Sequence, residues 1–240
     1  MPVIDANTLF GFWTTRPVDV SLQSLLTVLD KHQVDRACTI STKGLFSDHH
    51  EGNDQTWQAA QQDKRLIPVA TVDPGRYLGV AEEIRERAAQ GFPLFALFPE
   101  SQEWSAGSAC LTPVVAALAA AKKPVMVEAR QPGAPCAVGK AFTGTQIPVI
   151  LMGVGSDNLA EALAVAKEQP NVYLETHLLN TLGGLELVAS EVGADRLIFG
   201  SRAPLHYFSS SFLLVKYSGL SEDDKNAVLG GNLSRLLGVS

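Results

Sequence analysis

Six polar side chains that could carry out chemistry stand at, or just beyond, the ends of short apolar segments. They are Asn7, Asp73, Glu128, Arg130, His177 and Arg202. An imidazole has an unperturbed pKa that allows proton transfer near neutral pH, and a carboxylate can assist it. A guanidinium group has the planar donor geometry that binds carboxylates and other anions. We therefore predict catalytic roles for His177, Glu128 and Asp73. For Arg202, Arg130 and Asn7 we predict binding of a small polar or anionic ligand.

The same side chains also have a purely structural interpretation. Polar residues end most strands, where many of them cap helices or pair with each other. A histidine at a strand end is often a hydrogen-bonded structural residue. Arg202 and Glu128 could likewise form a buried ion pair that fills the site. Which interpretation holds depends on how the surrounding elements place these residues.

Eight short apolar segments of β-strand character recur along the chain, each followed by a stretch with helical periodicity. They are residues 3–7, 37–41, 67–72, 94–98, 124–128, 148–152, 172–176 and 197–201. Segments that are apolar on both faces are typical of parallel strands covered by helices. With 240 residues, each of the eight units spans about 30 residues, the length of a strand followed by a helix.

This unbroken alternation predicts an α/β protein, a single (β/α)8 TIM barrel over residues 1–240 with a C-terminal helix around 222–237. The alternative is an open doubly wound sheet, which usually has fewer strands and a glycine-rich dinucleotide fingerprint after the first. Residues 7–11, NTLFG, form no such fingerprint. In a barrel the carboxyl ends of the strands meet at one mouth, so we expect the six polar residues to gather there.

The composition excludes several classes of function. There are 19 Lys and Arg residues against 25 Asp and Glu residues, a net charge of −6, and no basic stripe of the kind that nucleic acids require. The apolar run at 111–121 is too short to span a membrane, and the first residues form no secretory signal. Cys38, Cys110 and Cys136 are widely spaced, as expected for free thiols in a reducing compartment. We expect a cytoplasmic protein, and a homo-oligomer remains open.

Several stretches resemble the amidohydrolase-related, metal-dependent hydrolases. They are VIDANTLFG (3–11), RLIPVATVDP (65–74), KPVMVEARQPG (123–133), the segment from NVYLETH to FGSRAPL (171–205) and LSEDDKNAVLGGNLSRLLGV (220–239). The resemblance spans nearly the whole chain and is most specific in the C-terminal third. It implies a TIM barrel and a hydrolase-like function, and the fold agrees with the independent count of eight units.

The resemblance also implies a metal site, and the residues of this chain depart from it. The family holds its metal with an H-x-H at the end of strand 1, histidines after strands 5 and 6, and an aspartate after strand 8. The corresponding residues here are Asn7, Leu9, Glu128, Gly153 and Arg202. Leucine and glycine offer no side-chain donor atom, and the arginine would repel a cation. We therefore expect no metal at this place and no other cofactor.

Two hypotheses from different classes follow. In the first, the protein is a metal-independent enzyme that acts on a small carboxylated substrate such as a lactone, an ester or an amide. In the second, it is a non-catalytic relative of the metal-dependent hydrolases that serves as a binding or assembly module. An open pocket with His177 directed into it would favour the enzyme, and a filled mouth with Arg202 paired to Glu128 would favour the module.

A second group of possible metal ligands, Asp48, His49, His50 and Glu51, follows the second strand. Adjacent side chains on an extended loop point in different directions, so we interpret this segment as a solvated loop.

Overall fold

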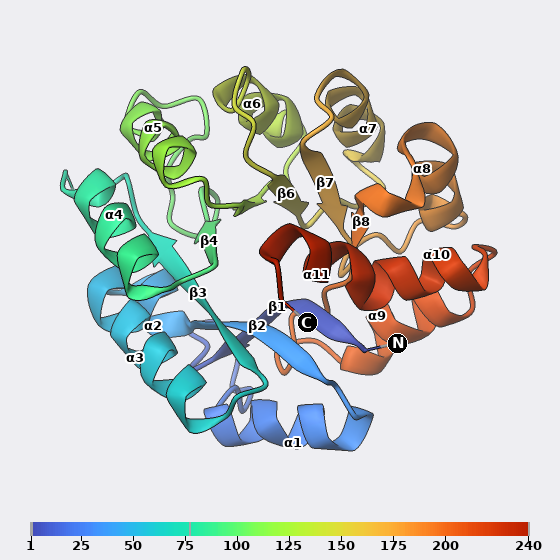
Figure 1. Ribbon diagram of the computed structural model, residues 1–240, viewed down its shortest axis with the longest axis horizontal. Coiled ribbons are helices and arrows are strands. Elements are labelled where there is room, and N and C mark those ends of the chain that lie inside the picture. Colours follow the sequence, from blue (N-terminus) through green and yellow to red (C-terminus); the bar gives the residue numbers. More distant parts are fainter. Residues whose placement is uncertain (1, 77, 240) are drawn as a thin grey trace.

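The computed structural model describes residues 2–76 and 78–239. Its strands and helices alternate around a ring, as Figure 1 shows. The strands are β1 (Ile4–Phe10), β2 (Arg36–Ser41), β3 (Leu66–Val72), β4 (Leu94–Leu97), β5 (Val125–Glu128), β6 (Val149–Met152), β7 (Val172–Glu175) and β8 (Leu197–Ile198). They pair in chain order and all in parallel. The predicted (β/α)8 barrel is confirmed.

Helices follow each strand and cover the outside of the sheet. They are α1 (Leu22–His32), α2 (Thr42–Phe46), α3 (His49–Gln62), α4 (Val80–Gln90), α5 (Leu111–Ala121), α6 (Ala134–Ala141), α7 (Leu159–Glu168), α8 (Gly184–Val192) and α9 (Phe208–Lys216). A 3-10 turn, η1 (Ala194–Arg196), precedes β8. The chain closes with α10 (Glu222–Asn226), a π turn η2 (Ala227–Gly231) and α11 (Asn232–Leu237), within the predicted C-terminal helical segment.

The ring is closed by contacts between the first strand and the residues that follow β8. Ala6 N donates to Phe199 O at 2.9 Å, and Leu9 N donates to Ala203 O at 3.0 Å. The pairing of β1 with β2 shifts its register between Asp5 and Thr8, which marks a bulge in β1. A bulge redirects the side chains beyond it, and here Leu9 is directed to the mouth of the barrel while Phe10 packs in the outer apolar layer.

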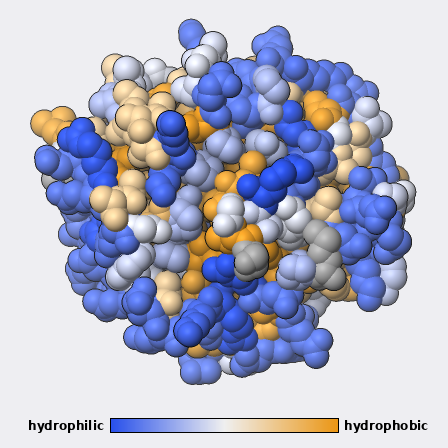
Figure 2. Space-filling model, viewed as in Figure 1, coloured by the Kyte–Doolittle hydropathy of each residue, from blue (hydrophilic) through white to orange (hydrophobic). Residues whose placement is uncertain are grey.

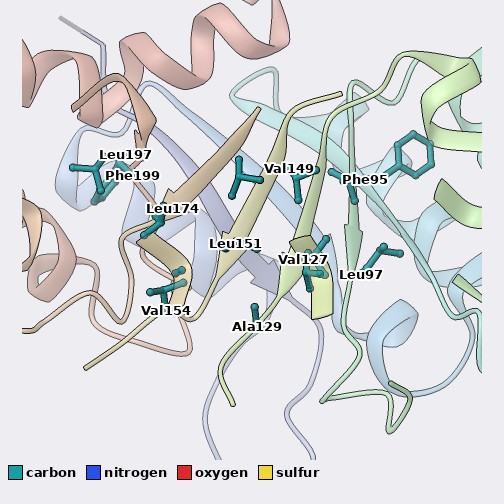
Figure 3. Close-up of a cluster of buried hydrophobic side chains, with 14 of the residues drawn as sticks. Phe95, Leu97, Val127, Ala129, Val149, Leu151, Val154, Leu174, Leu197 and Phe199 are labelled. Carbon is teal, nitrogen blue, oxygen red and sulfur yellow. The ribbon is translucent and has the colours of Figure 1, made fainter. Parts of the chain in front are cut away.

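Two apolar layers hold the barrel together. The outer layer lies between strands and helices, and Figure 3 shows the part formed by Phe95, Leu97, Val127, Leu151 and their neighbours. These side chains are completely buried, as expected for strands that are apolar on both faces.

The inner layer fills the barrel and includes Ile40, Ile67, Ala96 and Ile150. Leu233 of α11 packs into this layer, so α11 closes the end at which the strands begin, near the centre of Figure 1. Figure 2, drawn from the same side, shows a hydrophilic perimeter and hydrophobic atoms toward the centre. The candidate residues stand at the carboxyl ends of the strands, so they belong to the opposite end of the barrel from α11.

Within the described part of the chain, no helix combines the length and the hydropathy that a membrane crossing requires.

Candidate functional site

The mouth of the barrel holds a small, enclosed cavity against Arg202. The cavity measures about 10 Å³ and is lined by Asn7, Leu9, Ile40, Thr42, Leu45, Phe98 and Arg202. A space of that size holds about one water molecule. Arg202 follows β8 and is 5% exposed. Its backbone takes a left-handed conformation with φ of 58°, and its N–H donates to Asn7 O at 2.6 Å.

Within residues 2–76 and 78–239, the guanidinium group of Arg202 forms no ion pair and donates no hydrogen bond. The buried ion pair between Arg202 and Glu128, which the structural interpretation allowed, is therefore not formed. Burial lowers the pKa of Arg202, and the charge of Glu128 acts in the opposite direction. The Trp13 ring lies over the guanidinium, with its centroid 5.7 Å from Cζ. The positive charge of Arg202 is thus buried at the mouth without a direct salt bridge in the described residues, and the carboxylates of Glu128, Glu175 and Glu100 act on it from a longer distance.

His177, just beyond β7, pairs with Glu175 at the end of the same strand. Both side chains are fully buried, and His177 Nδ1 is hydrogen bonded to Glu175 Oε2. Glu175 also accepts from the His177 backbone N–H at 2.6 Å and from Asn7 Nδ2 at 3.2 Å. A carboxylate at Nδ1 fixes the tautomer that leaves a lone pair on Nε2. That Nε2 is buried and has no hydrogen-bond partner among the described residues.

His206 is a site residue that the sequence analysis missed. Its ring lies 5.8 Å from the ring of His177, and its backbone N–H donates to Arg202 O at 3.1 Å. Burial first, and then the electrostatic effects of His177 and Arg202, lower the pKa of His206 to about 4. His206 is therefore neutral at physiological pH. Its position four residues after Arg202 was the only sequence signal that could have revealed it.

Glu128 and Arg130, on and just after β5, occupy the rim of the mouth. Glu128 is buried and accepts from Ser101 twice, from N–H and from the hydroxyl group, both at 2.8 Å. The Arg130 side chain is 43% exposed, with Nε 3.5 Å from Glu100 Oε2 and 4.0 Å from Glu128 Oε1. Arg130 is therefore a solvated rim residue that is already balanced by carboxylates, unlike Arg202.

Asp73, after β3, interacts within its own loop. Its Oδ1 accepts from Gly75 N at 2.9 Å, and its Oδ2 lies 3.6 Å from Arg76 Nε. No contact in the described residues joins it to Arg202 or His177. The structure thus brings Asn7, His177 and Arg202 together, places Glu128 and Arg130 beside them, and leaves Asp73 apart.

Asp5, the second residue of β1, was also missed by the sequence analysis. It is completely buried and accepts from Asn7 N at 2.9 Å, Ser201 N at 3.0 Å and Ser201 Oγ at 2.5 Å. Burial raises its pKa to about 7, although these hydrogen bonds act in the opposite direction. A charged residue inside the apolar run VIDAN was the signal that could have identified it.

The segment from Asp48 to Glu51 differs from the solvated loop that we expected. Asp48 caps α3 by accepting from Glu51 N at 3.1 Å, and His49 is buried in the first turn. His50 Nδ1 is 2.6 Å from Glu83 Oε2 on α4. The prediction of a loop was wrong because Asp48 is a good N-cap, and helix capping took precedence over the polar composition.

These observations define a class of protein, the (β/α)8 barrels whose candidate site lies at the carboxyl ends of the strands. The family model described as Amidohydrolase matches residues 16–239. The chain belongs to the amidohydrolase family, as the sequence resemblance implied. None of the curated proteins matches it.

Solved structures share the fold along their whole length. 5-Carboxyvanillate decarboxylase from Sphingomonas paucimobilis superimposes with a TM-score of 0.79 at 13% identity, covering 100% of this chain and 99% of that one. An uncharacterised TIM-barrel protein from Bordetella bronchiseptica gives 0.81 at 16% identity, with 99% of each chain covered. A probable 2-pyrone-4,6-dicarboxylic acid hydrolase from Acinetobacter baumannii, with citric acid bound, gives 0.72 at 16% identity, covering 99% and 100%. At these identities the likeness concerns the fold.

At the positions that the sequence resemblance assigns to the family's metal ligands, several side chains are poor donors for a divalent cation. Leu9 is an apolar wall of the cavity, and Arg202 contributes a positive charge. Gly153 has φ of 81°, a conformation that a histidine side chain at that position would adopt only with strain. Both oxygens of Glu128 already accept from Ser101. In the part of the chain that the structure describes, no three His, Cys, Asp or Glu residues are grouped to hold a metal ion.

Proposed function

We propose that this protein binds a small carboxylate at Arg202 and acts on it as a metal-independent hydrolase of a lactone, ester or amide. The observation that carries the proposal is the buried guanidinium of Arg202, which has no acidic partner in residues 2–76 and 78–239. Burying a charge without a counter-charge is strongly unfavourable. A carboxylate from the substrate supplies that counter-charge through two parallel hydrogen bonds.

The proton chemistry of the proposal belongs to the pair formed by Glu175 and His177. The lone pair on His177 Nε2 accepts a proton from a water molecule as that water attacks the carbonyl carbon, and the same nitrogen then returns the proton to the leaving oxygen or nitrogen. Glu175 orients the His177 ring and stabilises the imidazolium that exists between the two proton transfers. This assignment replaces Glu128 as the carboxylate partner, because Glu128 hydrogen bonds to Ser101 and Glu175 bonds directly to His177.

The names of similar structures support a carboxylated ligand. Two of the enzymes named above act, by their names, on 5-carboxyvanillate and on a pyrone dicarboxylic acid, and the second has citric acid bound.

Calorimetric titration with citrate, succinate and benzoate tests the binding step. We expect a dissociation constant of about 1 mM or below for at least one of them, equivalent to about 4 kcal/mol. Arg202→Gln should abolish the heat signal. Arg65→Gln is the matched control, because Arg65 is already paired with Asp30 and Asp63 at the surface. Absence of binding to all three acids, or equal binding by Arg202→Gln, would overturn the proposal.

Hydrolysis of the 4-nitrophenyl monoester of succinic acid tests the chemical step. His177→Gln keeps a polar side chain but cannot accept the proton, so it should bind succinate normally and lose turnover. A rate that survives in His177→Gln would remove His177 from the mechanism.

The cavity volume favours a second candidate, the non-catalytic binding module. About 10 Å³ beside Arg202 accommodates one water molecule and no organic acid, and His177 is not among the residues that line this cavity, so a substrate requires lining side chains such as Leu45 and Phe98 to move. A protein that hydrolyses no carboxylated ester, lactone or amide, whether or not it binds succinate, would be this module.

A further inference from the structure

We propose that Asp5 is a positioning residue that aims Arg202 into the mouth and fixes its placement relative to His177. The proposal rests on the proposed function, since it assigns a role toward the carboxylate-binding group. Asp5 itself lies beneath the site and lines no part of the cavity.

The first support is the way in which Asp5 holds the segment that carries Arg202. Both oxygens of the carboxyl group bind Ser201, the residue before Arg202, through its N–H and its hydroxyl group. The Ser201 hydroxyl in turn accepts from Ala203 N at 3.0 Å, on the other side of Arg202. Asp5 therefore fixes the backbone on both sides of Arg202.

The second support is the conformation that these bonds maintain. Arg202 has φ of 58°, in the left-handed region that residues with a side chain rarely adopt. Such a conformation persists only where the surrounding structure over-determines it, and it is concentrated at functional sites. The hydrogen bonds of Asp5 and Ser201, together with Arg202 N to Asn7 O at 2.6 Å, supply that constraint.

The third support is the link from Asp5 to the proton-transferring pair. Asp5 Oδ1 also accepts from Asn7 N at 2.9 Å, where β1 has its bulge. The Asn7 side chain then donates to Glu175, which holds His177. One buried carboxyl group thus connects the cation that binds the substrate with the base that acts on it. Asp5 acts on both through its neighbours, on Arg202 through Ser201 and on His177 through Asn7 and Glu175.

Three variants and a control test the proposal by citrate titration. Asp5→Ala removes all the acceptors, and Ser201→Ala removes the hydroxyl relay while leaving Asp5 in place. Each should weaken citrate binding about tenfold or more, because misplacing a group by about 1 Å has effects of this size or larger. Asp5→Asn should keep most of the affinity, since its amide oxygen accepts from Asn7 N and Ser201 N and its NH₂ group donates to the Ser201 hydroxyl. Asp35→Ala is the control, because exposed Asp35 accepts from Val3 N just before β1.

A readout without ligand separates this proposal from the proposed function. The indole N–H signal of Trp13, assigned in a ¹⁵N NMR spectrum with Trp13→Phe, reports on the arginine that lies against that ring. Asp5→Ala and Ser201→Ala should shift this signal, and Asp5→Asn and Asp35→Ala should not. If wild type binds none of citrate, succinate and benzoate, the proposed function fails while this signal still decides the role of Asp5. If Asp5→Ala is too unstable to study, Ser201→Ala decides it. Unchanged binding and an unchanged Trp13 signal in Ser201→Ala would overturn the proposal.

Discussion

Replacing Asp5 by asparagine should change how the stability of the protein depends on pH. Burial raises the pKa of Asp5 from 3.8 to about 7, so the folded protein holds a proton that the unfolded chain releases in this range. Between pH 4 and pH 7 the folded state therefore binds more protons than the unfolded state. By linkage, the contribution of Asp5 to stability is complete below about pH 4 and is lost as the pH rises through about 7.

The size of the effect follows from the two pKa values. A pKa difference of one unit corresponds to about 1.36 kcal/mol, so the step from 3.8 to about 7 corresponds to about 4 kcal/mol. Asparagine does not ionise and has no such dependence. The second N–H of its amide would be left without a partner, which costs about 1–3 kcal/mol at every pH. The stability of Asp5→Asn relative to wild type should therefore rise by about 4 kcal/mol between pH 4 and pH 8, from a negative starting value.

Urea denaturation of both proteins from pH 4 to pH 8 measures this difference. All other titrating groups are common to the two chains, so their contributions cancel when the free energies of unfolding are subtracted. The slope of the unfolding free energy against urea concentration should be the same in both proteins, because both expose the same surface on unfolding. Two stability curves that run parallel over the whole range would refute the burial argument for Asp5.

Three further predictions concern the mouth and the core. Burial lowers the pKa of His206 to about 4, below its value of 6.5 in the unfolded chain. Protonation of His206 therefore favours unfolding, and stability is lost as the pH falls through that range. In urea titrations, His206→Gln should lose less stability than wild type between pH 7 and pH 5. Arg202→Met removes a buried charge that has no salt bridge among the described residues, so it should raise the free energy of unfolding by about 1–2 kcal/mol. Citrate binding should disappear in the same variant. A melting temperature below that of wild type would show that Arg202 is well solvated. Phe142 is completely buried against the barrel, so Phe142→Ala should cost about 3–5 kcal/mol in thermal unfolding, and a loss below 1 kcal/mol would place it outside the core.

The barrel could be predicted from the sequence because its strands are buried on both faces. Runs such as PVMVE and PVILM carry no polar residue before their ends, and this pattern leaves few alternatives to parallel strands under helices. The bulge in β1 could not be predicted, since it depends on how β1 pairs with both β2 and the segment after β8. The loop expected at Asp48 was a helix start, because a capping side chain there outweighed the polar composition.

The residues of the site could be predicted better than their partners. Asn7, His177 and Arg202 come together as expected from strand ends, because a barrel brings those ends to one mouth. Arg202 and Glu128 do not form a salt bridge in the described residues. The direction of a side chain at the mouth depends on neighbours from other strand–helix units, here Ser101 for Glu128 and Trp13 for Arg202. Asp5 and His206 were missed because neither stands at the carboxyl end of a strand.

The bond between Asp5 and Ser201 joins residues 196 positions apart, so it is among the last contacts that the chain can make during synthesis. While the first strand has left the ribosome and the eighth has not, Asp5 remains in water and carries its negative charge at neutral pH. Contacts this distant in sequence slow folding, since many residues must be ordered before they form. When the barrel finally closes, Asp5 loses its water and its pKa moves to about 7. Completion of the ring at neutral pH is therefore accompanied by partial proton uptake, and an acidic medium favours that last step.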